Sequence, residues 1–71
     1  MSGNYSKQLA GNLKRMRAEK GLTQTEFARK LGISQASLNR LEQGIQNVSL
    51  KSIELLCKRL NLKPNDLFLE K

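Results

Sequence analysis

Four side chains near the middle of the chain are of the types that recognise the edges of nucleic-acid bases. They are Gln35, Ala36, Asn39 and Arg40. Their spacing of one, four and five residues places them on one face of a helix. Glutamine and asparagine can pair with adenine, arginine can bind guanine through two hydrogen bonds, and alanine can contact the thymine methyl. The segment also lacks the Glu/Lys pairs of an ordinary solvated helix, so it predicts contact with DNA bases.

The overall charge agrees with a polyanionic partner. The chain has 71 residues, with 13 Lys and Arg against 6 Asp and Glu, and a net charge of +7. A chain of this length predicts a single domain, residues 1–71, with one modest core. The charge alone leaves nucleic acid, an anionic membrane, an acidic protein and a merely solubilising surface open.

Several kinds of chemistry are excluded by residue type. The chain has one cysteine, Cys57, and no histidine, which rules out an internal disulfide, a Cys/His zinc site and a Ser–His or Cys–His catalytic pair. No phosphate-binding glycine loop is present. We therefore expect no enzyme activity, metal, cofactor or small-molecule ligand. With no signal peptide and no apolar run of about 20 residues, we expect a cytoplasmic protein without a membrane partner.

Helical periodicity and punctuation predict an all-α fold with five short helices. The predicted helices are about 6–20, 24–31, 35–43, 50–60 and 64–69. A possible N-cap at Ser6 opens the first, a Thr23–Glu26 capping box opens the second, and Ser34 caps the third. The core stripe of the fourth helix is expected to comprise Leu50, Ile53, Leu56, Cys57 and Leu60. We interpret Cys57 as a small core residue rather than a redox sensor.

Residues 24–43 have the pattern of a helix-turn-helix, which is two short helices joined by a tight turn that begins with glycine. The turn is Gly32-Ile33-Ser34. Small Ala28 would let the two helices cross closely, Gly32 permits a positive φ, and Ile33 would enter the core. The alternative is a generic helical hairpin in which the glycine only ends a helix, but the base-reading face of the second helix argues against it.

The stretch from Leu22 to Gly44 resembles the helix-turn-helix of Cro and phage repressors, the XRE family. The resemblance extends from about Leu9 to Phe68. It implies a five-helix lambda-repressor-like DNA-binding domain. Its motifs are specific for this fold and for DNA binding as a class, and they do not identify the operator or the regulated genes.

The resemblance also implies roles for individual positions. Gln35, Ala36 and Arg40 occupy the main base-reading positions, and Asn39 points more sideways, towards base or backbone. Gln24 occupies the position of a glutamine that touches phosphate and braces Gln35. The implied phosphate contacts are Arg17, Thr23, Gln24, Ser37, Gln43, Gln46 and Asn47. In similar repressors an arginine and a glutamate matching Arg17 and Glu42 form an ion pair, whereas the following loop here lacks their usual Lys or Arg.

One recognition helix reads few base pairs, so we expect a homodimer that binds a two-fold symmetric operator in double-stranded DNA through the major groove. The helices within 49–69 would form the interface, with an apolar patch of Leu55, Pro64, Phe68 and Leu69. The alternative is that Phe68 is simply core and Leu55 an ordinary exposed leucine.

The predicted function is transcription regulation by operator occupancy, with RNA polymerase as a possible contact. Small members of the family include Cro-like repressors and restriction–modification controller proteins. An antitoxin that also regulates its own operon is the alternative. Three aromatic residues, two of them expected in the core, are too few for a platform that stacks single-stranded RNA.

Overall fold

The five predicted helices are present in the computed structural model, which describes residues 2–46 and 48–68 and the side chains from residue 5 onwards in these ranges. The helices are α1 (Ser2–Lys20), α2 (Gln24–Leu31), α3 (Gln35–Gln43), α4 (Leu50–Leu60) and α5 (Pro64–Leu67). No strand occurs within these ranges, so the all-α prediction is confirmed.

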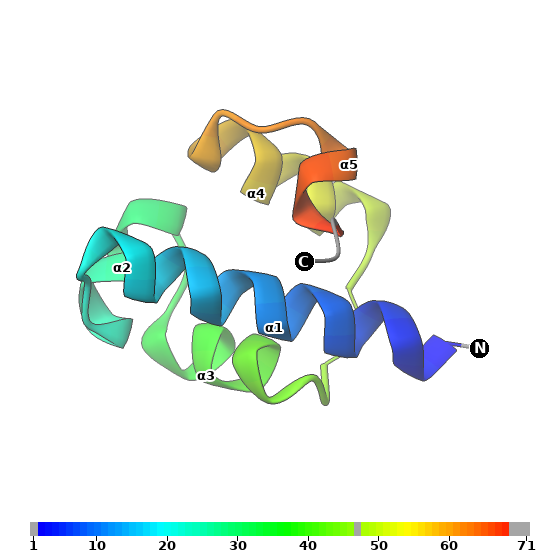
Figure 1. The fold of residues 1–71 in the computed structure, drawn as a ribbon, viewed down its shortest axis with the longest axis horizontal. Helices are drawn as coiled ribbons and strands as arrows, with labels where there is room; N and C mark the ends of the chain where they lie inside the picture. The colour runs from blue at the N-terminus through cyan, green and yellow to red at the C-terminus, as the bar shows by residue number, and fades with distance from the viewer. Residues whose placement is uncertain (1, 47, 69–71) are drawn as a thin grey trace.

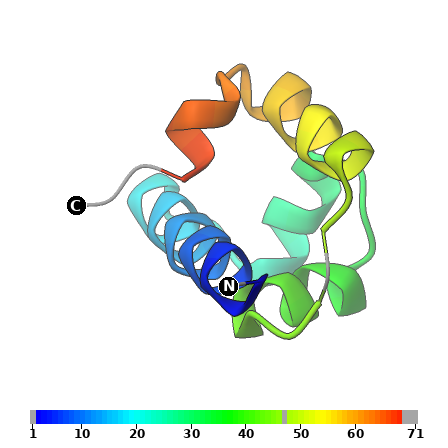
Figure 2. The same cartoon turned by 90° about the vertical axis from the view of Figure 1, so that its right-hand side faces the viewer.

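The long helix α1 lies between two pairs of shorter helices (Figure 1). It packs against α3 and α5, while α2 packs against α3 and α4. In Figure 2, which looks along α1, the shorter helices follow an arc whose two ends, α3 and α5, both meet α1. This arrangement leaves one side of α3 uncovered by the other helices.

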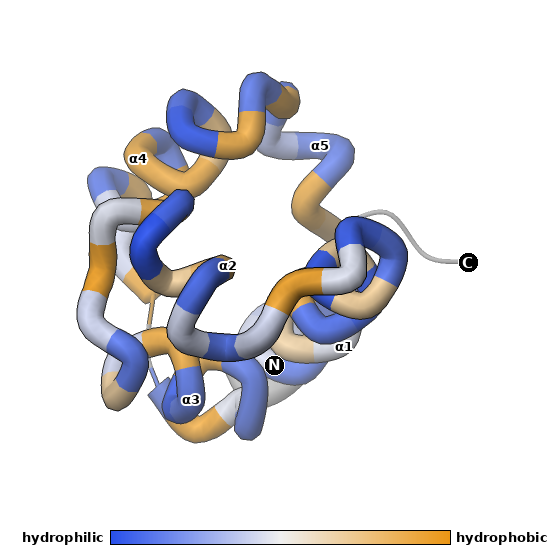
Figure 3. Tube along the Cα trace, turned by 90° about the vertical axis from the view of Figure 1, so that its left-hand side faces the viewer, coloured by the Kyte–Doolittle hydropathy of each residue, from blue (hydrophilic) through white to orange (hydrophobic). Residues whose placement is uncertain are grey.

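A single apolar core joins all five helices. Apolar residues alternate with polar ones along the chain (Figure 3), so each helix has apolar residues to contribute to it. Its buried members are Leu9, Leu13, Phe27, Ala28, Leu31, Leu38, Leu41, Leu56, Cys57 and Leu67. Burial raises the pKa of the Cys57 thiol above its ordinary value, so the thiol stays neutral near neutral pH. The interpretation of Cys57 as a small core residue is therefore confirmed.

Two helix boundaries and one core residue differ from the sequence prediction. α1 begins at Ser2, so Ser6 lies inside the helix and does not cap it. The additional turn is held by the ring of Tyr5, which packs edge-on against Phe68 with the ring centroids 5.9 Å apart. α5 ends at Leu67, where the next residue leaves the helical conformation. Leu50 is 75% exposed rather than in the core, because periodicity gives the direction of a side chain but not whether another element reaches it.

The buried Asn12 ties α1 to the end of α5, a contact that was not predicted from the sequence. Its Nδ2 donates a hydrogen bond to the Leu67 carbonyl oxygen, and its Oδ1 accepts one from Arg15 Nη1 at 2.8 Å. A buried amide needs such partners, because an unpaired one costs about 1–3 kcal/mol. The bond holds α5 against the side of α1 on which Leu9 and Leu13 lie buried.

Gly32 allows the turn between α2 and α3. Its φ is 74°, in the left-handed region, and its backbone N–H donates to carbonyl oxygens at the end of α2. The Arg59 guanidinium of α4 lies 3.3 Å from where a Cβ would be. Ile33 follows and packs, partly buried, against the core. The backbone conformation therefore favours glycine here, as the helix-turn-helix pattern predicted.

Candidate nucleic-acid interface

The start of α2 is fixed by the predicted capping box. The backbone N–H of Glu26 donates to Thr23 Oγ1 at 3.1 Å, and Glu26 Oε1 accepts from the backbone N–H of Thr23 at 2.8 Å. The bond from the backbone N–H of Thr23 to the carboxylate, and after it the Thr23 side chain, hold the pKa of Glu26 below its ordinary value. The box fixes the direction in which α2 leaves the preceding loop, and so places Gln24 at the first position of the helix.

The start of α3 is capped by Ser34, whose Oγ accepts from the backbone N–H of Ser37 at 3.1 Å. Its hydroxyl also donates to Ser37 Oγ at 3.0 Å. Leu38 and Leu41 anchor one side of α3 in the core. The cap and the anchors together determine which side of α3 faces outward.

The outward side of α3 carries the four predicted base-reading residues, and all four are exposed. They are Gln35, Ala36, Asn39 and Arg40. Arg40 Nε donates to Gln46 Oε1 at 3.3 Å, so the loop after α3 orients the arginine. The structure thus brings onto one surface an acceptor-and-donor amide, a methyl group and a guanidinium, which are the groups that recognise base edges in the major groove.

Behind this surface, Arg17 of α1 and Glu42 of α3 form an ion pair with two hydrogen bonds. Arg17 Nε lies 2.8 Å from Glu42 Oε2, and Arg17 Nη2 lies 3.0 Å from Oε1. The bond to the Glu42 carboxylate raises the pKa of Arg17 further above its ordinary value. The Glu42 side chain is only 2% exposed, whereas that of Arg17 is 28% exposed. The pair attaches α3 to the scaffold through a buried carboxylate.

Gln24 extends this pair to the exposed side of α3. Its Nε2 donates to Glu42 Oε1 at 3.2 Å and to Asn39 Oδ1 at 3.3 Å. Its Oε1 accepts from Gln35 Nε2 at 3.4 Å. Gln24 therefore contacts Gln35, as the resemblance implied. The contact with Asn39 was not foreseen, because only the assembled pair of helices places these side chains together.

The expected phosphate-contacting residues have different surroundings. Thr23 and Gln43 are exposed, whereas Arg17, Gln24, Ser37 and Gln46 are half-buried. Asn47 lies outside the described residues. Both N–H bonds of the Gln24 side chain already have acceptors within the protein. A phosphate contact from Gln24 would therefore use its backbone N–H at the start of α2.

The described members of the expected dimer patch differ in exposure. Leu55 is 40% exposed and lies on α4, and Pro64 is exposed at the start of α5. Phe68 is half-buried, with its ring against Tyr5. Leu69 lies outside the described residues. Phe68 thus has an intramolecular partner, as expected for a core residue.

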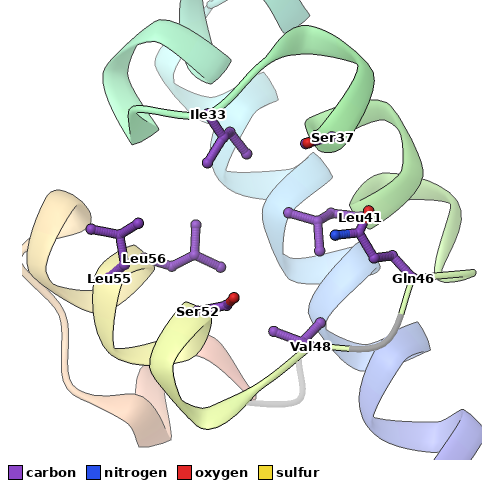
Figure 4. Close-up of a pocket in the computed structure, with 8 residues that line it drawn as sticks. All are labelled: Ile33, Ser37, Leu41, Gln46, Val48, Ser52, Leu55 and Leu56. Atoms are coloured by element: carbon purple, nitrogen blue, oxygen red, sulfur yellow. The ribbon is translucent and has the colours of Figure 1, made fainter.

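A groove between α3 and α4 was not predicted from the sequence, because its walls come from separate elements (Figure 4). It has a volume of about 200 Å³. Its lining residues are Ile33, Ser37, Leu41, Gln46, Val48, Ser52, Leu55 and Leu56. The volume is below the roughly 300 Å³ at which small-molecule pockets usually begin.

Within the described ranges, no group of three or more His, Cys, Asp and Glu side chains is placed to hold a metal ion. In the same ranges, no helix is both long enough and apolar enough to cross a bilayer.

The fold and the α2–α3 surface define a helix-turn-helix protein, and comparison with known families identifies which kind. The helix-turn-helix family HTH_3 matches residues 13–67. The chain therefore belongs to this family, the XRE type of DNA-binding transcription regulator, as the sequence resemblance predicted.

Individual relatives include both antitoxins and regulators. The chain is 43% identical over 56 residues to the antitoxin PezA of Streptococcus pneumoniae, covering 79% of this chain and 35% of PezA. It is 39% identical over 67 residues to the antitoxin HipB of Escherichia coli O6:H1, covering 80% of this chain and 71% of HipB. The crystal structure of the clp gene regulator ClgR from C. glutamicum is 30% identical, with a TM-score of 0.73, covering 89% of this chain and 82% of that one. The chain thus spans about a third of PezA and most of HipB and ClgR.

Proposed function

We propose that this protein regulates transcription by binding a two-fold symmetric operator as a homodimer, with α3 of each protomer in the major groove. The observation that carries the proposal is the exposed side of α3, where Gln35, Asn39 and Arg40 are held by hydrogen bonds to other parts of the protein. Side chains that are oriented before binding lose little freedom when they meet bases. The domain is taken as residues 1–71, with the helices within 49–69 supplying the dimer contacts.

Binding to the operator would combine base reading with phosphate contacts that are mostly neutral. Gln35 would read adenine, Arg40 guanine, and Ala36 a thymine methyl. Thr23, Ser37, Gln43 and Gln46 would bond to phosphate oxygens, with Arg17 adding a charge. Bound over a promoter, the dimer would block RNA polymerase, and bound just upstream it would contact the polymerase.

The proposal is tested by selecting bound sequences from a randomised duplex library at two salt concentrations. We expect enrichment of a two-fold symmetric site with half-sites about one helical turn apart. Gln35→Ala and Arg40→Ala should each lose preference at one base position per half-site. Lys51→Ala, which removes an exposed charge on α4, is the matched control and should weaken binding without changing the preferred sequence. Salt-sensitive binding with no enriched sequence would contradict the proposal.

A second candidate function is that of an antitoxin, and the likeness to PezA and HipB favours it. In that case the protein would bind a toxin as well as its own operator. The test is to express the product of the adjacent gene with and without this chain. Growth arrest that this chain relieves supports the antitoxin function, and arrest that persists at equal expression levels excludes it for that gene pair.

A further inference from the structure

We propose that Glu42 determines sequence specificity without touching DNA, by fixing the orientation in which Gln35 and Asn39 present their amide groups. The inference rests on the proposed operator binding and concerns a buried residue. The Glu42 side chain is 2% exposed and lies beneath the side chains that read bases. It is therefore a positioning residue, and its influence passes through Gln24.

The first step is that Glu42 fixes the orientation of Gln24. A carboxylate only accepts hydrogen bonds, and its Oε1 already accepts from Arg17 Nη2. The Gln24 atom 3.2 Å from this oxygen is Nε2, a donor. The same nitrogen donates to Asn39 Oδ1. Turning the Gln24 amide over would place its oxygen against the carboxylate oxygen and against the Asn39 oxygen, so one orientation is strongly favoured.

The second step is that Gln24 fixes the two residues in contact with it. Gln24 Oε1 faces Gln35, so Gln35 must give it an N–H from Nε2. The other N–H and the oxygen of Gln35 remain for the DNA, and a donor beside an acceptor matches the N7 and N6 groups of adenine. Asn39 gives its oxygen to Gln24 and keeps both N–H bonds of Nδ2 for acceptors such as guanine O6, thymine O4 or phosphate.

Replacing one carboxylate oxygen should therefore loosen the other links. In Glu42→Gln, Arg17 faces both atoms of the new amide, so the NH₂ group meets an Arg17 N–H in either orientation. Gln24 meets an oxygen in one orientation and an NH₂ group in the other, so its own amide is no longer held in a single orientation. Gln35 then presents either a donor beside an acceptor or two donors to the DNA, which weakens its preference for adenine over guanine.

The test compares the enriched sequences of four proteins in the same duplex selection. They are the unchanged chain, Glu42→Gln, Gln24→Met and Glu19→Gln. Gln24→Met has a side chain of similar length without hydrogen bonds and leaves the Arg17–Glu42 pair in place, so it tests the chain of amides even if Glu42→Gln does not fold. Glu19→Gln makes the same charge change on the exposed side of α1 and is the matched control.

The expected result is a change confined to one kind of position. The unchanged chain and Glu19→Gln should prefer adenine opposite Gln35 by roughly five- to a hundredfold. Gln24→Met and Glu42→Gln should each lose at least about fivefold of that preference, while the guanine preference opposite Arg40 stays in both. Retained adenine preference in Gln24→Met, or an equal loss at every position, would overturn the inference while leaving operator binding intact. No enriched sequence with the unchanged chain would instead overturn the proposed function, and the inference with it.

Discussion

Removing either member of the Arg17–Glu42 pair should destabilise the fold, and the two removals should differ in size. After Glu42→Ala, the half-exposed guanidinium of Arg17 can regain water, so the loss should lie below the full range for a buried pair, at about 2–3 kcal/mol. After Arg17→Ala, the carboxylate of Glu42 stays buried with only Gln24 as a hydrogen-bond donor among its described contacts, so the loss should reach about 3–5 kcal/mol.

Thermal and urea denaturation followed by circular dichroism measures both losses. One kcal/mol lowers Tm by about 4–8 °C in a domain of this size, so Glu42→Ala should melt about 8–24 °C below the unchanged chain. The double variant Arg17→Met/Glu42→Leu buries no charge and should be more stable than Arg17→Ala. A larger loss for Glu42→Ala than for Arg17→Ala, or a variant that melts like the unchanged chain, would refute this role of the ion pair.

Three further predictions concern the turn, a helix cap and the dimer. Gly32→Ala should lower the free energy of unfolding, measured by urea denaturation, by about 1–2 kcal/mol, because its φ of 74° is strained for alanine. Gly11→Ala, at an open helical site, is the control and should raise the free energy of unfolding by about 0.5–1 kcal/mol. The lowered pKa of Glu26 means that its ionised form adds stability above the unfolded pKa and that this is lost as pH falls through the folded pKa. Glu26→Gln should therefore be less stable than the unchanged chain at neutral pH, and the difference should disappear as the pH falls below the folded pKa of Glu26. A difference that persists in acid would contradict the capping explanation. Leu55→Glu should raise the dimer dissociation constant, measured by sedimentation equilibrium, by about tenfold or more without changing the Tm of the protomer. An unchanged dissociation constant would show that Leu55 is not in the interface.

The features predicted correctly from the sequence are local ones. The caps at Thr23 and Ser34 act on backbone groups three residues ahead, so their signals lie within one turn of sequence. The positive φ at Gly32 likewise follows from glycine at a helix end. These signals place α2, the turn and α3 accurately, and so place the outward side of α3.

The features that were missed depend on parts of the chain that are distant in sequence. Asn12 gave no signal, because its acceptor is a carbonyl oxygen 55 residues away at the end of α5. Leu50 has the spacing of a core residue, yet it is 75% exposed. The Gln24–Asn39 contact requires the crossing geometry of α2 and α3. Spacing predicts direction along one helix, whereas burial and partners depend on how the helices pack.

The way the candidate interface is held bears on how its affinity would divide between charge and base reading. The loop Ile45–Val48 contains no Lys or Arg, and Arg40 is the single cation among the four base-reading side chains. Attraction to phosphate, which every DNA sequence offers equally, would therefore come largely from elsewhere on the chain. Gln35 and Asn39 are already oriented through Gln24, so DNA binding would not bear the roughly 0.5–1.5 kcal/mol that fixing each such side chain requires. If the proposed operator binding holds, a surface built in this way favours discrimination between sequences over general attraction to DNA.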